Sequence, residues 1–188
     1  MSLEPLLSRI EPDGGIPPVD QWNPAHCGDM DLLIRADGSW IHEGTPIGRP
    51  RLIRLLSRVL RREENGDYCL VTPVEKLRIA VEDQPFLIVD AECIEERDGG
   101  EPVWWLSTNT GDRLVLDGQH RLSVSETRDG EPVPEVPVRF GLSARFNRNV
   151  YYRLIDIAEQ REVGGRIELG LSSGGIWHLL GHVDKDPE

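Results

Sequence analysis

The stretch RPRLIRLLSRVLRREENGDYCL, residues 49–70, decides the predicted fold. Its apolar residues recur at the spacing of one helical face: Leu52, Leu55, Leu56 and Val59. Pro50 suits the first turn of a helix, and Asn65 with Gly66 suits its end. We therefore predict a helix over this stretch, stopped by glycine and followed by a strand.

A second stretch repeats this pattern 99 residues further along the chain. Residues 148–169 read RNVYYRLIDIAEQREVGGRIEL, and Gly165 is aligned with Gly66. The other positions identical without gaps are Arg49 and Arg148, Arg54 and Arg153, Leu55 and Leu154, Arg62 and Arg161, Glu63 and Glu162, and Leu70 and Leu169. Both stretches read arginine, helix, Arg-Glu, glycine and strand, which indicates an internal duplication.

The remaining patterns are mostly those of strands. Asp37-Gly38 between two apolar runs favours a β-hairpin, and Ser173-Gly174 favours another near the end of the chain. The runs YCLVTPV, KLRIAVE and PFLIVDAECIEE predict an antiparallel meander.

Together these elements predict an α+β fold. It would consist of two similar strand-helix-strand repeats that form small antiparallel sheets or partly open β-barrel or roll units, each with one packed helix. We expect an N-terminal arm over residues 1–30, a first repeat over 31–100 and a second over 101–188. A proline cluster at Pro132, Pro134 and Pro137 is the candidate joint.

Composition excludes several classes of protein. Thirty-three acidic residues against 21 basic ones give a formal net charge of -12, which disfavours binding to nucleic acid or to an anionic membrane. No apolar run reaches the roughly 18 residues that span a bilayer, so we expect a soluble cytoplasmic protein. Cys27, Cys69 and Cys93 lack C-x-x-C spacing, and we expect neither disulfides nor a bound metal or cofactor.

The chain resembles one bacterial family from about Trp22 to Leu180. The resemblance rests on the tokens Gly28-Asp29-Asp31, Asp37-Gly38-Ser39-Trp40, Pro46-Ile47, Thr72-Pro73-Val74-Glu75-Lys76, Val81-Glu82-Asp83, Pro85-Phe86, Thr108-Asn109, Val138-Arg139 and Gly141-Leu142. This family is the mostly proteobacterial domain of unknown function family 1285. The resemblance implies a two-part fold with similar halves and a signalling or ligand-sensing role, with no catalytic residues to transfer. The chain departs from the family at residues 118–122, where GQHRL stands in place of a His-Pro-Leu-Arg type of run.

The predicted helix that begins at Pro50 carries a basic stripe. It consists of Arg51, Arg54, Arg58, Arg61 and Arg62. Guanidinium groups bind phosphate and carboxylate bidentately, so the stripe is a candidate docking surface for a phosphorylated or acidic partner protein. A solvated helix face paired with nearby acids explains the same residues.

Other residues are candidates for a small-molecule site. Trp40 and His42 share one face of a strand and could form a pocket wall, or simply an ordinary half-buried strand. Arg49 and Arg148 precede the two helices, where each could bind an anion or brace the sheet. Lys76 with Glu75 could cap a hairpin, form an internal ion pair or contact a ligand.

The chemistry of His120 leaves an enzymatic alternative open. His120 with Asp112 and Asp117 could supply a general base or metal ligands, although these are also ordinary turn residues. The Walker loop and the dinucleotide fingerprint are absent from the sequence. We therefore expect a non-catalytic sensing or adaptor protein that binds a small molecule or partner protein at the cleft between the repeats. The alternative is a hydrolase or transferase with a site around His42, Asp117 and His120.

Overall fold

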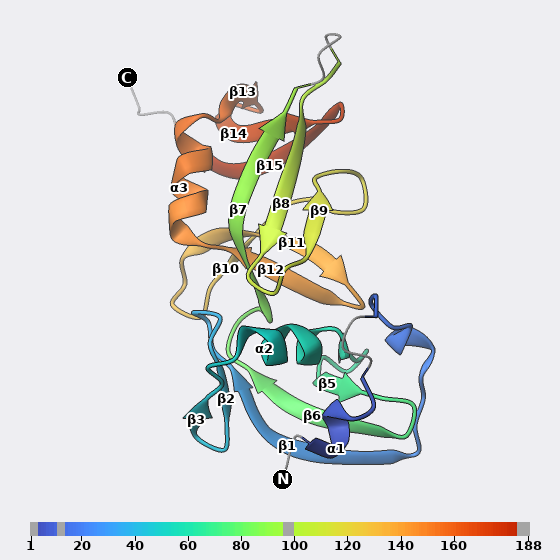
Figure 1. Ribbon diagram of the computed structural model, residues 1–188. Coiled ribbons are helices and arrows are strands. Elements are labelled where there is room, and N and C mark those ends of the chain that lie inside the picture. Colours follow the sequence, from blue (N-terminus) through green and yellow to red (C-terminus); the bar gives the residue numbers. More distant parts are fainter. Residues whose placement is uncertain (1–3, 11–13, 96–99, 184–188) are drawn as a thin grey trace. The chain divides into compact units, whose positions relative to one another are not determined.

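The computed structural model describes residues 4–10, 14–95 and 100–183 (Figure 1). Within it the chain forms two compact units. The first comprises Met1–Pro85 together with Arg139–Leu142, and the second comprises Phe86–Val138 together with Ser143–Glu188.

The first unit is built on one six-stranded sheet. Its strands are β1 (His26–Ile34), β2 (Trp40–His42), β3 (Thr45–Pro46), β4 (Leu60–Arg62), β5 (Tyr68–Val71) and β6 (Glu75–Val81), in the order β3-β2-β1-β6-β5-β4. Two antiparallel meanders, β1 to β3 and β4 to β6, are joined by a parallel pairing of β1 with β6. The helical elements of this unit are α1 (Glu4–Leu7), η1 (Val19–Gln21) and α2 (Pro50–Ser57).

The predicted hairpin at Asp37-Gly38 is confirmed. Strands β1 and β2 pair antiparallel, and Gly38 takes a φ of 86° in the turn between them. The backbone N–H and the hydroxyl of Ser39 both donate to Oδ1 of Asp37, at 2.9 and 2.6 Å. These hydrogen bonds lower the pKa of Asp37.

Alternation along β6 separates the core of the first unit from a polar face. Leu77 and Ile79 are buried, whereas Lys76 and Arg78 lie on the other side of the strand. The largest fully buried side chains of this unit are Leu6, Leu32, Ile34, Trp40, Leu56, Leu60, Leu70 and Leu77. The face opposite this core is therefore the one on which basic side chains meet solvent.

The second unit repeats the strand order of the first. Its six-stranded sheet consists of β7 (Phe86–Ile94), β8 (Val103–Thr108), β9 (Arg113–Val115), β10 (Ser123–Glu126), β11 (Pro132–Arg139) and β12 (Leu142–Phe146), in the order β10-β11-β12-β7-β8-β9. Again two meanders meet at a parallel pair, here β7 with β12. Then follow α3 (Arg148–Asp156) and a three-stranded sheet of β13 (Glu159–Val163), β14 (Arg166–Ser173) and β15 (Ile176–Val183).

The predicted α+β class with a packed helix in each repeat is wrong, because the described chain is mostly β. Helices α2 and α3 begin close to the predicted residues but have only eight and nine residues. The glycines expected to stop them, Gly66 and Gly165, lie instead in hairpin turns, with φ of 93° and 82°. A helix stop and a hairpin turn both need a positive φ, so glycine alone does not distinguish them.

The sheets also differ from the prediction of small antiparallel sheets. Each six-stranded sheet is mixed, since its two central strands run parallel. The sequence echo at an offset of 99 residues aligns α2, β4 and β5 with α3, β13 and β14. In the first unit these strands belong to the six-stranded sheet, whereas in the second they form a sheet of their own. The sequence echo and the repeated strand order are thus two different correspondences.

Candidate functional site

A hollow of about 890 Å³ opens on the polar face of the first unit's sheet. Its floor comes from neighbouring strands: Lys76 of β6 is paired with Cys27 of β1, and Arg78 of β6 is paired with both Asp29 of β1 and Cys69 of β5. Because paired residues share a face of the sheet, these side chains leave it on the same side. We call this hollow the sheet cavity.

The N-terminal arm is held at the sheet cavity by Arg61 of β4. One guanidinium nitrogen of Arg61 donates to the carbonyl oxygens of Val19 at 2.6 Å and of Trp22 at 2.8 Å. The same side chain is only 13% exposed and forms a 2.7 Å ion pair with Glu63. Trp22 itself lines the cavity. The arm therefore forms a fixed part of the cavity wall.

Glu63 lies between two basic groups. Its carboxylate accepts from Nε of Arg61 at 2.7 Å and from Nζ of Lys76 at 3.2 Å. Burial acts to raise the pKa of Glu63, but the hydrogen bonds from Arg61 and Lys76 outweigh it and lower that pKa. Glu63 is thus an ionised group shared by two cations.

Arg78 has the opposite surroundings. Its Nε donates to Oδ1 of Asp29 at 2.7 Å, and its Nη1 lies 3.8 Å from Oδ2 of Asp67. The hydrogen bond to Asp29 raises the pKa of Arg78. The side-chain amide of Asn65 donates to Asp67 at 3.0 Å and orients that carboxylate. One cation is thus shared by two carboxylates.

The two cysteines of the sheet cavity differ in reactivity. Cys69 is buried, and burial together with the nearby Glu63 raises its pKa to about 11. Because the thiolate is the nucleophile, Cys69 is inert at neutral pH. Cys27 is exposed.

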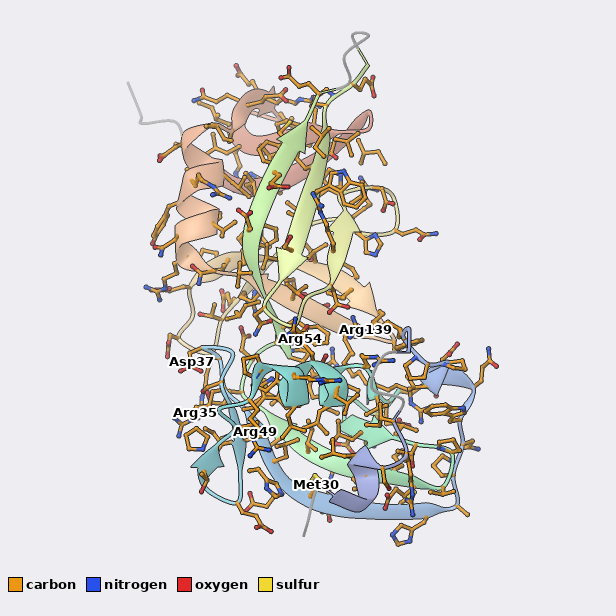
Figure 2. The ribbon with its side chains drawn as sticks, in the orientation of Figure 1. Met30, Arg35, Asp37, Arg49, Arg54 and Arg139 are labelled. Atoms are coloured by element: carbon orange, nitrogen blue, oxygen red, sulfur yellow. The ribbon has the colours of Figure 1, made fainter. Side chains whose placement is uncertain are left out.

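The segment Arg139–Leu142 completes the wall. The carbonyl oxygen of Phe140, a cavity-lining residue, accepts from the backbone N–H of Arg62 at 3.0 Å. The guanidinium of Arg139, labelled in Figure 2, donates to the carbonyl oxygen of Ser57 at 3.0 Å. A Cβ on Gly141 would lie 3.2 Å from Cβ of Arg62, so the segment packs closely on β4.

Comparison with known proteins gives the chain a family. The model of the N-terminal domain of unknown function DUF1285 matches residues 17–84, and the model of the DUF1285 C-terminal domain matches residues 85–180. The chain belongs to the DUF1285 family. The two matched regions meet where the first unit gives way to the second.

Two solved structures of DUF1285 family proteins are similar to this chain. One, from Silicibacter pomeroyi, is 39% identical with a TM-score of 0.83, covering 95% of this chain and 94% of the other. The other, from Shewanella baltica, is 29% identical with a TM-score of 0.50, covering 66% of this chain and 90% of the other. No match was found among curated proteins.

Of the six candidate ligand residues, Lys76 lies in the sheet cavity. Trp40 is 1% exposed and belongs to the core, whereas His42, two residues further along β2, is half-buried. Arg49 is exposed at the residue before α2 (Figure 2). His120 and Arg148 belong to the second unit, where Arg148 forms an ion pair with Glu131.

The predicted basic stripe does not form one helix face. Arg51 and Arg54 are exposed on α2, and Arg54 is labelled in Figure 2. Arg58 lies at the end of that helix, and its guanidinium donates to the carbonyl oxygen of Gly15. Arg61 lies in β4 and lines the sheet cavity. Helix α2 ends at Ser57, and residues predicted to continue it form strand β4 instead.

The residues of the enzymatic alternative are divided between the two units. Nδ1 of His120 lies 3.3 Å from Oδ1 of Asp117, and this carboxylate also accepts the backbone N–H groups of Gln119 and His120. Burial opposes ionisation, but these hydrogen bonds lower the pKa of Asp117. The carboxylate of Asp112 instead accepts a hydrogen bond from the hydroxyl of Thr110. His42 belongs to the first unit. Across the described residues, no group of three His, Cys, Asp or Glu side chains could hold a metal ion.

Sequence reasoning missed most of the charged residues that line the sheet cavity in the described part of the chain: Asp20, Asp29, Glu63, Glu64, Asp67 and Arg78. A signal for one of them was present, because Asp29 falls within the motifs that carry the family resemblance. Nothing local indicates that Asp29 and Arg78, 49 positions apart, are neighbours. In the described part of the chain, no helix is long and apolar enough to cross a membrane.

Proposed function

We propose that this DUF1285 protein is a non-catalytic sensing module that binds a small polar molecule in the sheet cavity. The observation that carries this function is that the charged lining is already held in place by hydrogen bonds within the unit. A preformed site loses little side-chain entropy on binding, which favours affinity. Such concave sites with a few fixed polar groups are the usual places for small ligands.

Partner binding and cellular setting belong to the same hypothesis. The exposed Arg51 and Arg54 of α2 are the candidate contacts for an acidic partner protein that would receive the signal. We place this role in the cytoplasm, because the sequence carries three cysteines without the spacing of a disulfide framework. The enzymatic alternative rests on the contact between Asp117 and His120 alone.

The exposed Cys27 allows a direct test, because it lines the sheet cavity. A thermal-shift screen of metabolites would first identify compounds that stabilise the full chain; a ligand at 100 times its dissociation constant adds about 2.7 kcal/mol. Each stabilising compound would then be tested for protection of Cys27 against iodoacetamide. Cys93, which is exposed in the second unit, is the internal control.

A true ligand is expected to slow alkylation of Cys27 and to leave alkylation of Cys93 unchanged. The variant Cys27→Trp should abolish the thermal shift by filling the cavity, and the matched variant Cys93→Trp should retain it. Stabilising compounds that protect neither thiol, or that still bind Cys27→Trp, would place binding elsewhere and contradict this function.

A further inference from the structure

The charges of the sheet cavity are nearly balanced overall and form two groups of ion pairs. Among the residues that the structure describes, four basic and five acidic side chains line it. A ligand with several negative charges, such as a nucleotide, needs a surplus of basic groups that this lining lacks. A near-neutral lining with two groups of ion pairs instead suits a ligand that carries one charge of each sign.

One end of the cavity has a cationic surplus. Arg61 and Lys76 share the single carboxylate of Glu63. One nitrogen of Arg61 also donates to the two arm carbonyl oxygens. Lys76 is therefore the cation at this end whose remaining N–H donors can bind a ligand. A carboxylate on the ligand would supply the second anion.

The other end has an anionic surplus. Asp29 and Asp67 share the single guanidinium of Arg78, at 2.7 and 3.8 Å. The longer of these contacts leaves Asp67 with acceptor capacity, while Asn65 holds its orientation. An ammonium group on the ligand would supply the second cation.

Burial and strand geometry give the orientation and the spacing. The side chains of Glu63 and Lys76 are 21% and 23% exposed, whereas that of Asp29 is 71% exposed. The cationic end is therefore the deeper one. Lys76 and Arg78 are two residues apart on β6, a spacing of about 6.6 Å along a strand.

We propose that the sheet cavity takes a small zwitterion, with its carboxylate at Lys76 and its ammonium group at the carboxylates of Asp29 and Asp67, which flank Arg78. This ligand class rests on the proposed function. The two charges of the ligand are separated by about the spacing of alternate strand residues. An ω-amino acid has this separation, and an α-amino acid with no second charge does not.

Three probes of equal length test this ligand class: δ-aminovalerate, which carries both charges, and valerate and n-pentylammonium, which carry one each. Titrations of the full chain, followed by backbone amide chemical shifts, would yield the dissociation constants. We expect δ-aminovalerate to bind about tenfold more tightly than either analogue, since each charge-assisted hydrogen bond contributes about a factor of ten.

Two variants assign the ends of the ligand. Lys76→Gln should reduce the preference for δ-aminovalerate over n-pentylammonium, and Asp29→Asn should reduce the preference over valerate. Arg113→Gln, an exposed arginine of the second unit paired with Glu92, is the matched control and should change neither ratio. The ratios are internal to each variant, so modest loss of stability does not obscure them.

The outcomes separate this ligand class from the proposed function. If δ-aminovalerate binds no better than its analogues while another compound protects Cys27, the zwitterion is wrong and the cavity still binds a ligand. If no compound protects Cys27, both fail. Equal effects of Lys76→Gln and Asp29→Asn on both ratios would also overturn the assigned orientation.

Discussion

Strands β6 and β12 hold equivalent places in two sheets of the same order, yet their basic side chains have opposite surroundings. Lys76 and Arg78 of β6 line an open cavity. Arg145 of β12 is 5% exposed, and it donates to the hydroxyl of Ser125 at 2.8 Å and to the carbonyl oxygen of Val133 at 2.9 Å. One strand order thus supports an accessible charged surface in one unit and a closed polar interior in the other.

The contrast shows that the strand order positions a side chain without deciding its role. Strands β10 and β11 enclose Arg145: the carbonyl oxygens of Ser125 and Val133 accept from its guanidinium, and the carboxylate of Glu135 lies 3.6 Å away. On the corresponding face of the first unit, β4 and β5 supply Arg61 and the small Cys69, and the centre stays open. The lining residues of the neighbouring strands therefore make the site.

The largest effect is expected where the polar interior is closed. Arg145→Met would remove the cation beside Glu135 and the donor to the carbonyl oxygens of Ser125 and Val133. Breaking a buried pair in this way costs about 3 to 5 kcal/mol. Urea unfolding would measure the loss. Arg78→Met, on an arginine that is more than half exposed, is the matched control and should change the midpoint far less. Equal losses would mean that the buried Arg145 contributes no more to stability than the exposed Arg78.

The second unit should also tolerate added volume less well than the floor of the sheet cavity. A Cβ on Gly170 would lie 2.4 Å from Cζ2 of Trp177 and 2.6 Å from the carbonyl oxygen of His178. Gly170→Ala is therefore expected to cost about 1 to 3 kcal/mol through overpacking. A Cβ on Gly28 would lie 3.3 Å from Leu77, a contact that the flexible leucine can relieve. Thermal unfolding should show a clearly smaller loss for Gly28→Ala.

Local sequence patterns predicted the hairpins and the helix starts but not the pairing of distant strands. Asp37-Gly38 and the turn after Ser173 carry their own signal, because turn chemistry is local. The helix ends were wrong because Gly66 and Gly165 satisfy a hairpin turn as well as a helix stop. The parallel pairing of β1 with β6 joins His26 to Glu75, and no periodicity encodes that partner.

The candidate site was less predictable than the fold for the same reason. Lys76 was named from a motif, whereas Asp29 and Arg78 face each other only after the parallel pair has formed. Trp40 looked like a pocket wall because an aromatic residue in a strand suits both a wall and a core. Its burial to 1% exposure places it in the core.

A pH-dependent effect should come from His178 of β15, another polar group closed into the second unit. Burial, followed by the charge of Arg121, lowers its pKa below 6.5, while Asp117 acts in the opposite direction. Its Nδ1 accepts from the backbone N–H of Leu122 at 3.4 Å, and its Nε2 has no hydrogen-bond partner in the described part of the chain. The folded protein therefore holds this imidazole neutral.

The unfolded chain binds a proton at His178 more readily than the folded protein does. His178 therefore takes nothing from the free energy of unfolding above about pH 6.5. As the pH drops below that value, the free energy of unfolding falls by at most about 1.4 kcal/mol per pH unit. Denaturant unfolding at a series of pH values would measure this slope. His178→Gln should flatten it between about pH 6.5 and the lower pKa of the folded state. An unchanged slope in that variant would show that His178 is not its source.

The smallest effect is expected at the deep end of the sheet cavity, from Glu63. Its pKa is lowered in the folded state, so its contribution is complete above the unfolded value of 4.5 and disappears as the pH falls through the folded value. Glu63→Gln should therefore cost about 1 kcal/mol at pH 7 and progressively less at lower pH. Glu64→Gln, exposed on the same cavity rim, is the matched control and should cost less.

Chemical denaturation of both variants at neutral and acidic pH distinguishes two origins of this effect. If the carboxylate of Glu63 stabilises the first unit through Arg61 and Lys76, the difference between the variants shrinks with acid. If the difference persists when the carboxylate is protonated, Glu63 contributes through packing alone. In that case Glu63 would not act as the shared anion of Arg61 and Lys76 at the cationic end of the cavity.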